Sequence, residues 1–300
     1  MHRRSFIRNT AFTFGALSLG QQKLFAALFP LAGNIKMLRN NVGIYTERGG
    51  TIGFLVNKDG IVVIDSQFPE QSQNFITEIK KISDKAFRFL INTHHHGDHS
   101  GGNISFKGVV QNVVAHQNSL VNQKATAEKA KTEDKQLYPD TTYTKKWKAK
   151  LGGEKISMNY YGPAHTNGDS IIYFDEANIA HMGDLMFNRR HPFVDRSAGA
   201  SIQNWIEVLN KAATKYEKDT LYIFGHAAEG YEVTGSKEDV VKFREYLQRL
   251  LDFARKEVAA GTTKEIFIKN TAIPGVTEWK GDGMERPLTA AFEEITAARK

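Results

Sequence analysis

The chain has 300 residues, of which 41% are hydrophobic and 24% charged, a composition typical of a globular protein long enough to bury a sizeable core. It contains no cysteine, so disulfides, iron–sulfur clusters, thiolate nucleophiles and cysteine-containing zinc sites are excluded. The formal net charge is +7, but four of the basic residues lie among the first thirty, which hold no acidic residue. The rest of the chain is only mildly basic, and we expect no nucleic-acid partner.

Residues 1–33 are predicted to be an export signal. Residues 3–8 read RRSFIR, and the apolar stretch 10–20 follows, so the segment resembles a Tat-type signal. A membrane-spanning helix needs about 20 apolar residues, so no stable membrane anchor is expected. The pattern predicts contact with the Tat export machinery and a periplasmic or secreted protein. A basic start of an N-terminal helix is the alternative.

Residues 34–300 are predicted to form one domain in which strands and helices alternate. Strands are expected where β-branched and aromatic residues cluster, over 42–46, 52–57, 61–65, 87–92, 110–116, 156–161, 170–174, 178–182 and 221–224. Helices are expected where apolar residues have helical spacing or alanine is frequent, over 69–82, 124–135, 202–216, 239–260 and 287–300. This order predicts two sheets with helices outside. The last helix could cap the fold or meet a partner.

Four of the ten histidines lie in the segment 93–99, THHHGDH, directly after the apolar strand 87–92. In an extended segment His94 and His96 point to the same side, so their imidazoles can share one metal ion. Gly97 permits the turn that redirects Asp98 and His99 toward a second one. Imidazoles combined with a carboxylate suit zinc, with iron or manganese as alternatives.

Three more candidate ligands stand at the ends of apolar runs. His165 lies in GPAHTNGD (162–169), Asp184 in HMGDL (181–185) and His226 in FGHA (224–227). Because strand ends of one sheet layer face one crevice, these side chains can converge with the histidine-rich segment.

These motifs, met in this order, resemble the metallo-β-lactamase-fold superfamily over about residues 35–270. The resemblance implies an α/β fold of four layers, an αβ/βα sandwich, with two Zn²⁺ ions between the sheets. The implied ligands of the first metal are His94, His96 and His165. Those of the second are Asp98, His99 and His226. Asp184 is implied to bridge the two ions, His95 not to be a ligand, and Asp65 to support the histidine loop from behind.

Asp184 stands where the best-known β-lactamases have cysteine. An aspartate at this position is more similar to glyoxalase II-type thioesterases, lactonases and other hydrolases of the superfamily. The resemblance implies a zinc-dependent metallo-hydrolase that cleaves an amide, ester or thioester bond of a β-lactam, lactone or related small molecule by a metal-bound hydroxide. Asp98 is the expected catalytic residue, which orients the hydroxide and passes its proton on. A glyoxalase II-like thioesterase and an iron-dependent redox member of the same fold are the alternatives.

Three side chains near these loops are predicted to contact substrate. Arg190, with Arg189 as the alternative, could hold a substrate carboxylate with two hydrogen bonds, or could be an ordinary surface base. Asn167 could contact a carbonyl oxygen or form a turn. His191 could assist the reaction or only pack against its neighbours.

Overall fold

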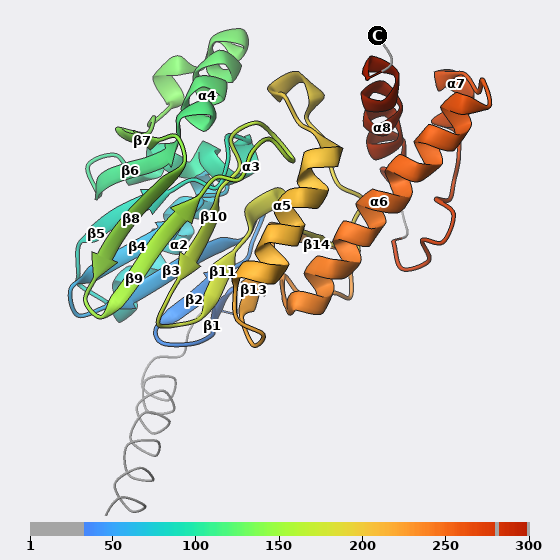
Figure 1. Cartoon of the computed structure of the whole chain (residues 1–300). Coiled ribbons are helices and arrows are strands. Elements are labelled where there is room, and N and C mark those ends of the chain that lie inside the picture. Colours follow the sequence, from blue (N-terminus) through green and yellow to red (C-terminus); the bar gives the residue numbers. More distant parts are fainter. Residues whose placement is uncertain (1–32, 280–281, 299–300) are drawn as a thin grey trace, which may run out of the picture.

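The computed structural model describes residues 33–279 and 282–298, so the predicted export signal lies outside the described residues except for Gly33. Two sheets pack face to face and helices cover the outer face of each (Figure 1). This arrangement confirms the predicted αβ/βα sandwich. No helix within the described ranges is both long and apolar enough to cross a membrane.

The first sheet has seven strands in sequential order. They are β1 (Ile35–Met37), β2 (Val42–Tyr45), β3 (Ile52–Asn57), β4 (Gly60–Ile64), β5 (Phe87–Ile91), β6 (Val110–His116) and β7 (Thr141–Tyr143). The strands β1 to β4 form an antiparallel meander, whereas β4 to β7 are parallel. Parallel strands end at one edge of a sheet, so Asp65 after β4 and the segment 93–99 after β5 emerge side by side.

The second sheet has the order β15-β13-β11-β10-β9-β8. Its strands are β8 (Lys146–Leu151), β9 (Glu154–Asn159), β10 (Ile171–Phe174), β11 (Ile179–His181), β13 (Leu221–Ile223) and β15 (Thr234–Gly235). Two short strands, β12 (Phe187–Asn188) and β14 (His226–Ala227), pair in parallel and place Phe187 beside His226. Strands β11 and β13 are parallel neighbours, so the segments that follow them leave the sheet at the same edge.

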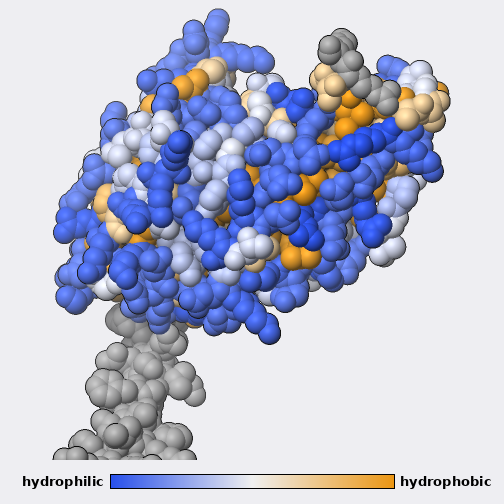
Figure 2. Space-filling model, viewed as in Figure 1, coloured by the Kyte–Doolittle hydropathy of each residue, from blue (hydrophilic) through white to orange (hydrophobic). Residues whose placement is uncertain are grey.

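Two groups of helices enclose the sheets. The first sheet carries α2 (Pro69–Ile82), α3 (Gly97–Ser100), η1 (Gly101–Phe106), α4 (Gln117–Ala130) and η2 (Glu133–Lys135). The second carries η3 (Gly183–Leu185), η4 (Arg196–Ala198), α5 (Ile202–Lys215), α6 (Lys237–Ala259), α7 (Lys264–Phe267) and α8 (Glu285–Ala297). The face in Figure 2 is mostly hydrophilic, with apolar residues gathered where α6, α7 and α8 meet. There the Phe267 ring packs, tilted, against the rings of Phe253 and Phe292.

Strand alternation explains the layers. Val62 and Ile64 of β4 point between the sheets, whereas Ile61 and Val63 point outward against α2. On the other sheet, Ile172 faces the inner core and its neighbour Ile171 the outer one, where α5 and α6 pack. Both faces of each sheet are therefore buried, which is why these strands are almost continuously apolar.

Several short elements, among them β1, β7 and α7, were not predicted, and two longer elements differ from expectation for a clear physical reason. The helix predicted over 124–135 is α4, which spans Gln117–Ala130, because the His116 side chain accepts a hydrogen bond from Asn118 N and begins the helix earlier. It ends where Lys131 adopts a left-handed conformation (φ 55°). The strand β8 was not predicted, because lysines alternate with its apolar residues. It lies at the edge of the second sheet, where exposed lysines discourage pairing with another chain.

Candidate metal centre

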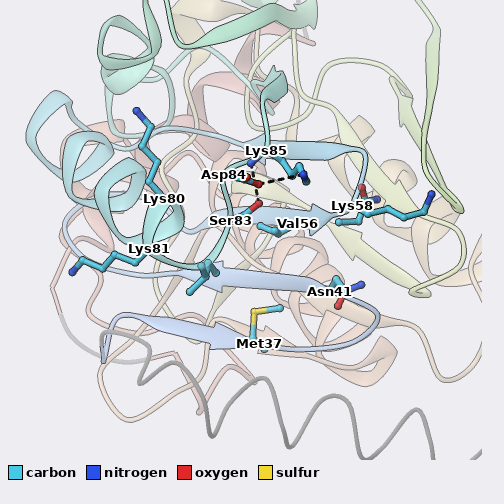
Figure 3. Close-up of a pocket in the computed structure, with 11 residues that line it drawn as sticks. Met37, Asn41, Val56, Lys58, Lys80, Lys81, Ser83, Asp84 and Lys85 are labelled. Atoms are coloured by element: carbon cyan, nitrogen blue, oxygen red, sulfur yellow. Dashed lines mark hydrogen bonds and ion pairs between the residues drawn. The ribbon is translucent and has the colours of Figure 1, made fainter.

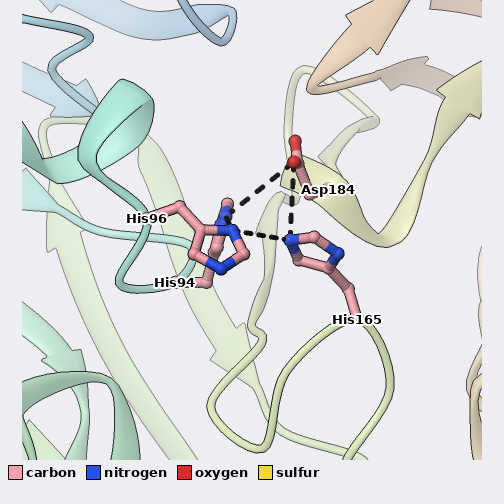
Figure 4. Close-up of side chains that lie close together, drawn as sticks. All are labelled: His94, His96, His165 and Asp184. Atoms are coloured by element: carbon pink, nitrogen blue, oxygen red, sulfur yellow. Dashed lines mark hydrogen bonds and ion pairs between the residues drawn. The ribbon is translucent and has the colours of Figure 1, made fainter. Parts of the chain in front are cut away.

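The loops at the strand ends bring together all seven predicted ligands. One group consists of His94, His96, His165 and Asp184 (Figure 4). A second consists of Asp98, His99 and His226. Within each group the candidate ligand atoms lie within 4.8 Å of one another. Residues separated by more than 120 positions in the sequence thus share one site.

The first group has the spacing that a tetrahedral metal ion requires. His96 Nδ1 lies 3.1 Å from His94 Nε2 and 2.9 Å from His165 Nε2. Asp184 Oδ2 lies 3.5 Å from His165 Nε2 and 3.9 Å from His94 Nε2. Ligand atoms bound to one zinc ion at about 2.0–2.1 Å are about 3.4 Å apart, so the four atoms fit one ion after small adjustments.

The outward nitrogens of these rings fix which nitrogen carries the proton. His165 Nδ1 donates to the carbonyl oxygen of Phe193 (2.7 Å). His94 Nδ1 lies 2.9 Å from Thr93 Oγ1, which in turn donates to Asp65 Oδ2. The neutral rings therefore direct their lone pairs inward, as metal binding requires.

In the second group each histidine contacts a carboxylate. His226 Nε2 lies 3.1 Å from Asp98 Oδ2 and 3.3 Å from His99 Nε2. Behind it, His99 Nδ1 donates to Asp65 Oδ2 at 2.7 Å. Asp65 is fully buried and also accepts from Thr93 N, so one carboxylate supports the histidine-rich loop at two points.

Asp184 lies between the two groups. Its Oδ2 faces His94 and His165, whereas Oδ1 lies 2.9 Å from His99 Nε2 and 3.3 Å from His226 Nε2. Both nitrogens face the buried Oδ1, but neither forms a well-aligned hydrogen bond with it. A buried carboxylate surrounded by imidazole nitrogens is stabilised when a cation is bound among them. The donor set therefore fits cations on both sides of Asp184.

Burial and charge make the two groups electrostatically different. Burial lowers the pKa of His165 to about 3 and that of His94 well below its usual range, so both rings are neutral at pH 7. Burial alone would also lower the pKa of His99, but Asp184 and Asp65 hold it well above the usual range. Burial alone would raise the pKa of Asp184, but His226 and His99 hold it well below normal.

Two glycines let the backbone approach these ligands. A Cβ atom on Gly225 would overlap Asp184 Oδ1, and one on Gly50 would overlap the ring of His99. Only glycine at position 225 therefore leaves room for Asp184 between the two groups of ligands.

Arg190 and Arg189 have very different surroundings, although they are neighbours in sequence. Arg190 is exposed, and its Nη1 lies 3.5 Å from His226 Nδ1. Arg189 is buried and paired with Asp239 (2.7 Å) and Glu278 (2.9 Å). Arg189 is therefore held in internal ion pairs, whereas Arg190 lies exposed beside His226.

The other two predicted substrate contacts have partners within the protein. Asn167 Oδ1 accepts from Asn122 of α4 (2.9 Å), and His191 is buried with Nδ1 3.0 Å from the Tyr246 hydroxyl. A contact of either side chain with substrate stays a prediction.

Three further contributors to the site were not singled out from the sequence. Thr93 and Asp195 hold outward nitrogens of His94 and His96, respectively. The Phe193 ring is 41% exposed and lies 5.4 Å from the His96 ring, so it forms an apolar wall beside the first group. Only position in a loop near the ligands could have indicated them.

A groove of about 580 Å³ lies away from these residues (Figure 3). Lysines 80, 81 and 85 line it, just before β5, whereas the histidine-rich segment follows β5. The groove is therefore at the opposite end of the sheet from the candidate metal centre. Lys81 pairs with Glu78 and Lys85 with Asp84, so much of its charge is neutralised within the protein.

An αβ/βα sandwich whose strand-end loops gather five histidines and two aspartates has the architecture of a metal-dependent hydrolase. The family model described as the metallo-beta-lactamase superfamily matches residues 45–226, more than half of the chain. The chain belongs to this superfamily.

Its relatives include several β-lactamases. Metallo-beta-lactamase IND-1 of Chryseobacterium indologenes is 26% identical over 201 residues, which are 63% of this chain and 80% of that protein. The type 2 metallo-beta-lactamase of Bacillus cereus is 25% identical over 206 residues, which are 66% of this chain and 77% of that protein.

Solved structures share the fold. A metallo-beta-lactamase from Pontibacter korlensis has a TM-score of 0.61 and 20% identity, over 71% of this chain and 98% of that one. The sec-alkylsulfatase Pisa1 from Pseudomonas sp. has a TM-score of 0.66 and 14% identity, over 87% of this chain and 50% of that one. A match of 87% has to include part of the chain after residue 236, so the fold likeness extends into the C-terminal helices.

Proposed function

We propose that this protein is a dinuclear zinc hydrolase that cleaves an amide, ester or thioester bond of a small molecule, with a β-lactam or lactone as candidate substrates. The observation that carries the proposal is the position of Asp184, whose two oxygens each face one group of histidines. Imidazole and carboxylate ligands without cysteine suit zinc, which the superfamily membership also supports.

When bound, the two cations supply Lewis acidity, which polarises a carbonyl group and lowers the pKa of a water molecule toward about 7. The chain supplies the remaining functions. Asp98 is about one-third exposed, and its Oδ2 lies beside His226 at the open side of the second group. Burial alone would raise the pKa of Asp98, but the hydrogen bond from His226 and the charge of His99 lower it to about 2. Asp98 is therefore ionised at neutral pH and can accept a hydrogen bond that orients a water molecule.

Arg190 and Phe193 define what reaches the site. Arg190 has no acidic partner among the described residues and lies beside His226, so it is available for an anionic group of the substrate. The exposed ring of Phe193 stands next to His96 and offers an apolar surface. We infer a substrate that combines an anionic group with an apolar part near the bond that is cleaved.

Metal analysis and a substrate panel test the proposal. We expect about two zinc ions per chain, whereas one iron ion per chain would favour the redox alternative. The panel contains a β-lactam, a homoserine lactone, a glutathione thioester and a secondary alkyl sulfate, the last because an alkylsulfatase shares the fold. Hydrolysis of the thioester alone would favour the glyoxalase II-like alternative. Failure to bind any metal would contradict the proposal.

We also propose that residues 1–33 direct export through the Tat machinery to the periplasm. The twin arginine at positions 3 and 4 supports this proposal. Changing both arginines to lysine should keep the protein in the cytoplasm, as measured by cell fractionation. Export of this variant at the normal rate would contradict it.

A further inference from the structure

Asp195 lies behind the first group of histidines, between β12 and α5. The residue is 9% exposed, and its carboxylate is held through both oxygens. Oδ1 accepts hydrogen bonds from Ser197 Oγ (2.5 Å) and Ala198 N (3.1 Å), so Asp195 is the N-cap of η4. Oδ2 accepts from His96 Nε2 at 3.0 Å, across 99 positions of the sequence.

We propose that Asp195 is a positioning residue that prepares His96 to bind the first metal ion, and that Glu294 of the C-terminal helix holds the segment that carries it. The inference rests on the proposed function, in which His96 is a ligand. Because Asp195 keeps the proton of His96 on Nε2, the lone pair of Nδ1 faces His94 and His165. A carboxylate behind a metal-binding imidazole typically contributes 10- to 100-fold in metal affinity.

The same segment orients a second ligand of the group. The Phe193 carbonyl oxygen accepts a hydrogen bond from His165 Nδ1 (2.7 Å), and Asp195 N donates one to the carbonyl oxygen of His165 (3.1 Å). Residues 193–195 therefore form a rigid support for two of the three histidines.

Glu294 of α8 fixes the far end of this support. Its carboxylate accepts hydrogen bonds from Arg196 Nη1 (3.0 Å), Ile202 N (2.8 Å) and Gln203 N (2.9 Å). Two of these donors are the first backbone amides of α5, where a negative charge is favourable. Arg196 directly follows Asp195, so the contact links the C-terminal helix to the residue behind His96.

Asp195→Asn tests the first part of the proposal. Asparagine offers one acceptor oxygen, so it can cap η4 or accept from His96, but not both. We expect a competing chelator to remove one of the two zinc ions 10 to 100 times more readily than from the wild type, and the other equally. Ser197→Ala is the matched control, because it removes a hydrogen bond from the same carboxylate and leaves the bond to His96 intact.

Glu294→Gln tests the second part. It should weaken the same zinc ion severalfold, whereas the neighbouring Glu293→Gln, which loses only a pair with Lys264, should not. Equal zinc binding by the Glu294 and Glu293 variants would overturn the role of α8.

A measurement on the unmodified protein covers the case in which Asp195→Asn does not fold. In ¹⁵N NMR spectra of the zinc-loaded wild type, His96 should carry a slowly exchanging proton on Nε2. A His96 ring without that proton, or an Asp195→Asn variant with unchanged zinc affinity, would overturn the role of Asp195. A wild type that binds no zinc would instead contradict the proposed function.

Discussion

Asp65→Asn should weaken both the fold and the second metal group. Asp65 is fully buried, and its Oδ2 accepts from Thr93 Oγ1 and His99 Nδ1 while Oδ1 accepts from Thr93 N, each at 2.7 Å. Its backbone is left-handed (φ 64°), a conformation that asparagine also tolerates, so the substitution tests the side chain and not the turn.

The size of the effect follows from these three hydrogen bonds. Asparagine can keep the two bonds made by Oδ2, but its amide group then faces the N–H of Thr93, donor against donor. A buried unpaired donor costs about 1–3 kcal/mol, and the remaining bonds lose the charge of the carboxylate. We expect the free energy of unfolding to fall by about 2–4 kcal/mol. Zinc affinity of the group containing His99 should fall about 10- to 100-fold.

Two assays measure these quantities. Urea denaturation of the metal-free protein gives the free energy of unfolding. Competition with a chromophoric chelator gives the zinc affinity. Asp84→Asn is the control, because that side chain is exposed at the opposite end of the sheet. An Asp65→Asn protein with wild-type stability and zinc affinity would show that the buried carboxylate does not support the loop.

Four further changes test the site. His96→Ala should lose activity by orders of magnitude, and a variant with full metal content and rate would refute its assignment as a ligand. Arg190→Ala should raise KM about 10- to 100-fold for an anionic substrate, as expected for lost hydrogen bonds to a charged group, and leave a neutral analogue unaffected. Gly225→Ala should displace Asp184 and lower the zinc content, which metal analysis would detect. The pKa of His99 is raised, so a metal ion must displace the proton of this ring in order to bind. As the pH falls, zinc should therefore leave the group containing His99 first. Titration with a chelator between pH 8 and 5 would measure this order.

The layers of the fold were predictable because the central strands are mostly apolar in sequence. The runs 52–57 and 61–65 are mostly apolar on both faces and match β3 and β4 within a residue. The run 110–116 matches β6, although Gln111 and Asn112 interrupt its apolar pattern. Local pattern failed where local and tertiary preferences differ. The strand β8 looks polar in sequence, but every second side chain is wholly or partly buried and Trp147 packs on Phe89 of the first sheet.

The candidate ligands were predictable as a set, together with Asp65 as one support, but the second support, Asp195, was not. Asp195 has no local pattern, because its partner His96 is 99 positions away and meets it only after the two sheets pack. Arg189 and Arg190 show the same limit. Both are arginines, so the sequence does not distinguish them. The left-handed backbone at Arg189 (φ 55°) and its ion pairs with Asp239 and Glu278 decide that Arg189 is the buried one.

The division of the site between the two halves of the chain has a consequence for stability. His94, His96, Asp98 and His99 come from the first sheet, whereas His165, Asp184 and His226 come from the second. Each group therefore draws on both halves, and an ion bound there joins loops of the two sheets. Since ions bind the folded chain and not the dispersed ligands, their binding energy adds to the folding energy. Each half also supplies a buried carboxylate behind a ring: Asp65 of the first half bonds His99, and Asp195 of the second bonds His96, so both rings are held in place by the protein itself.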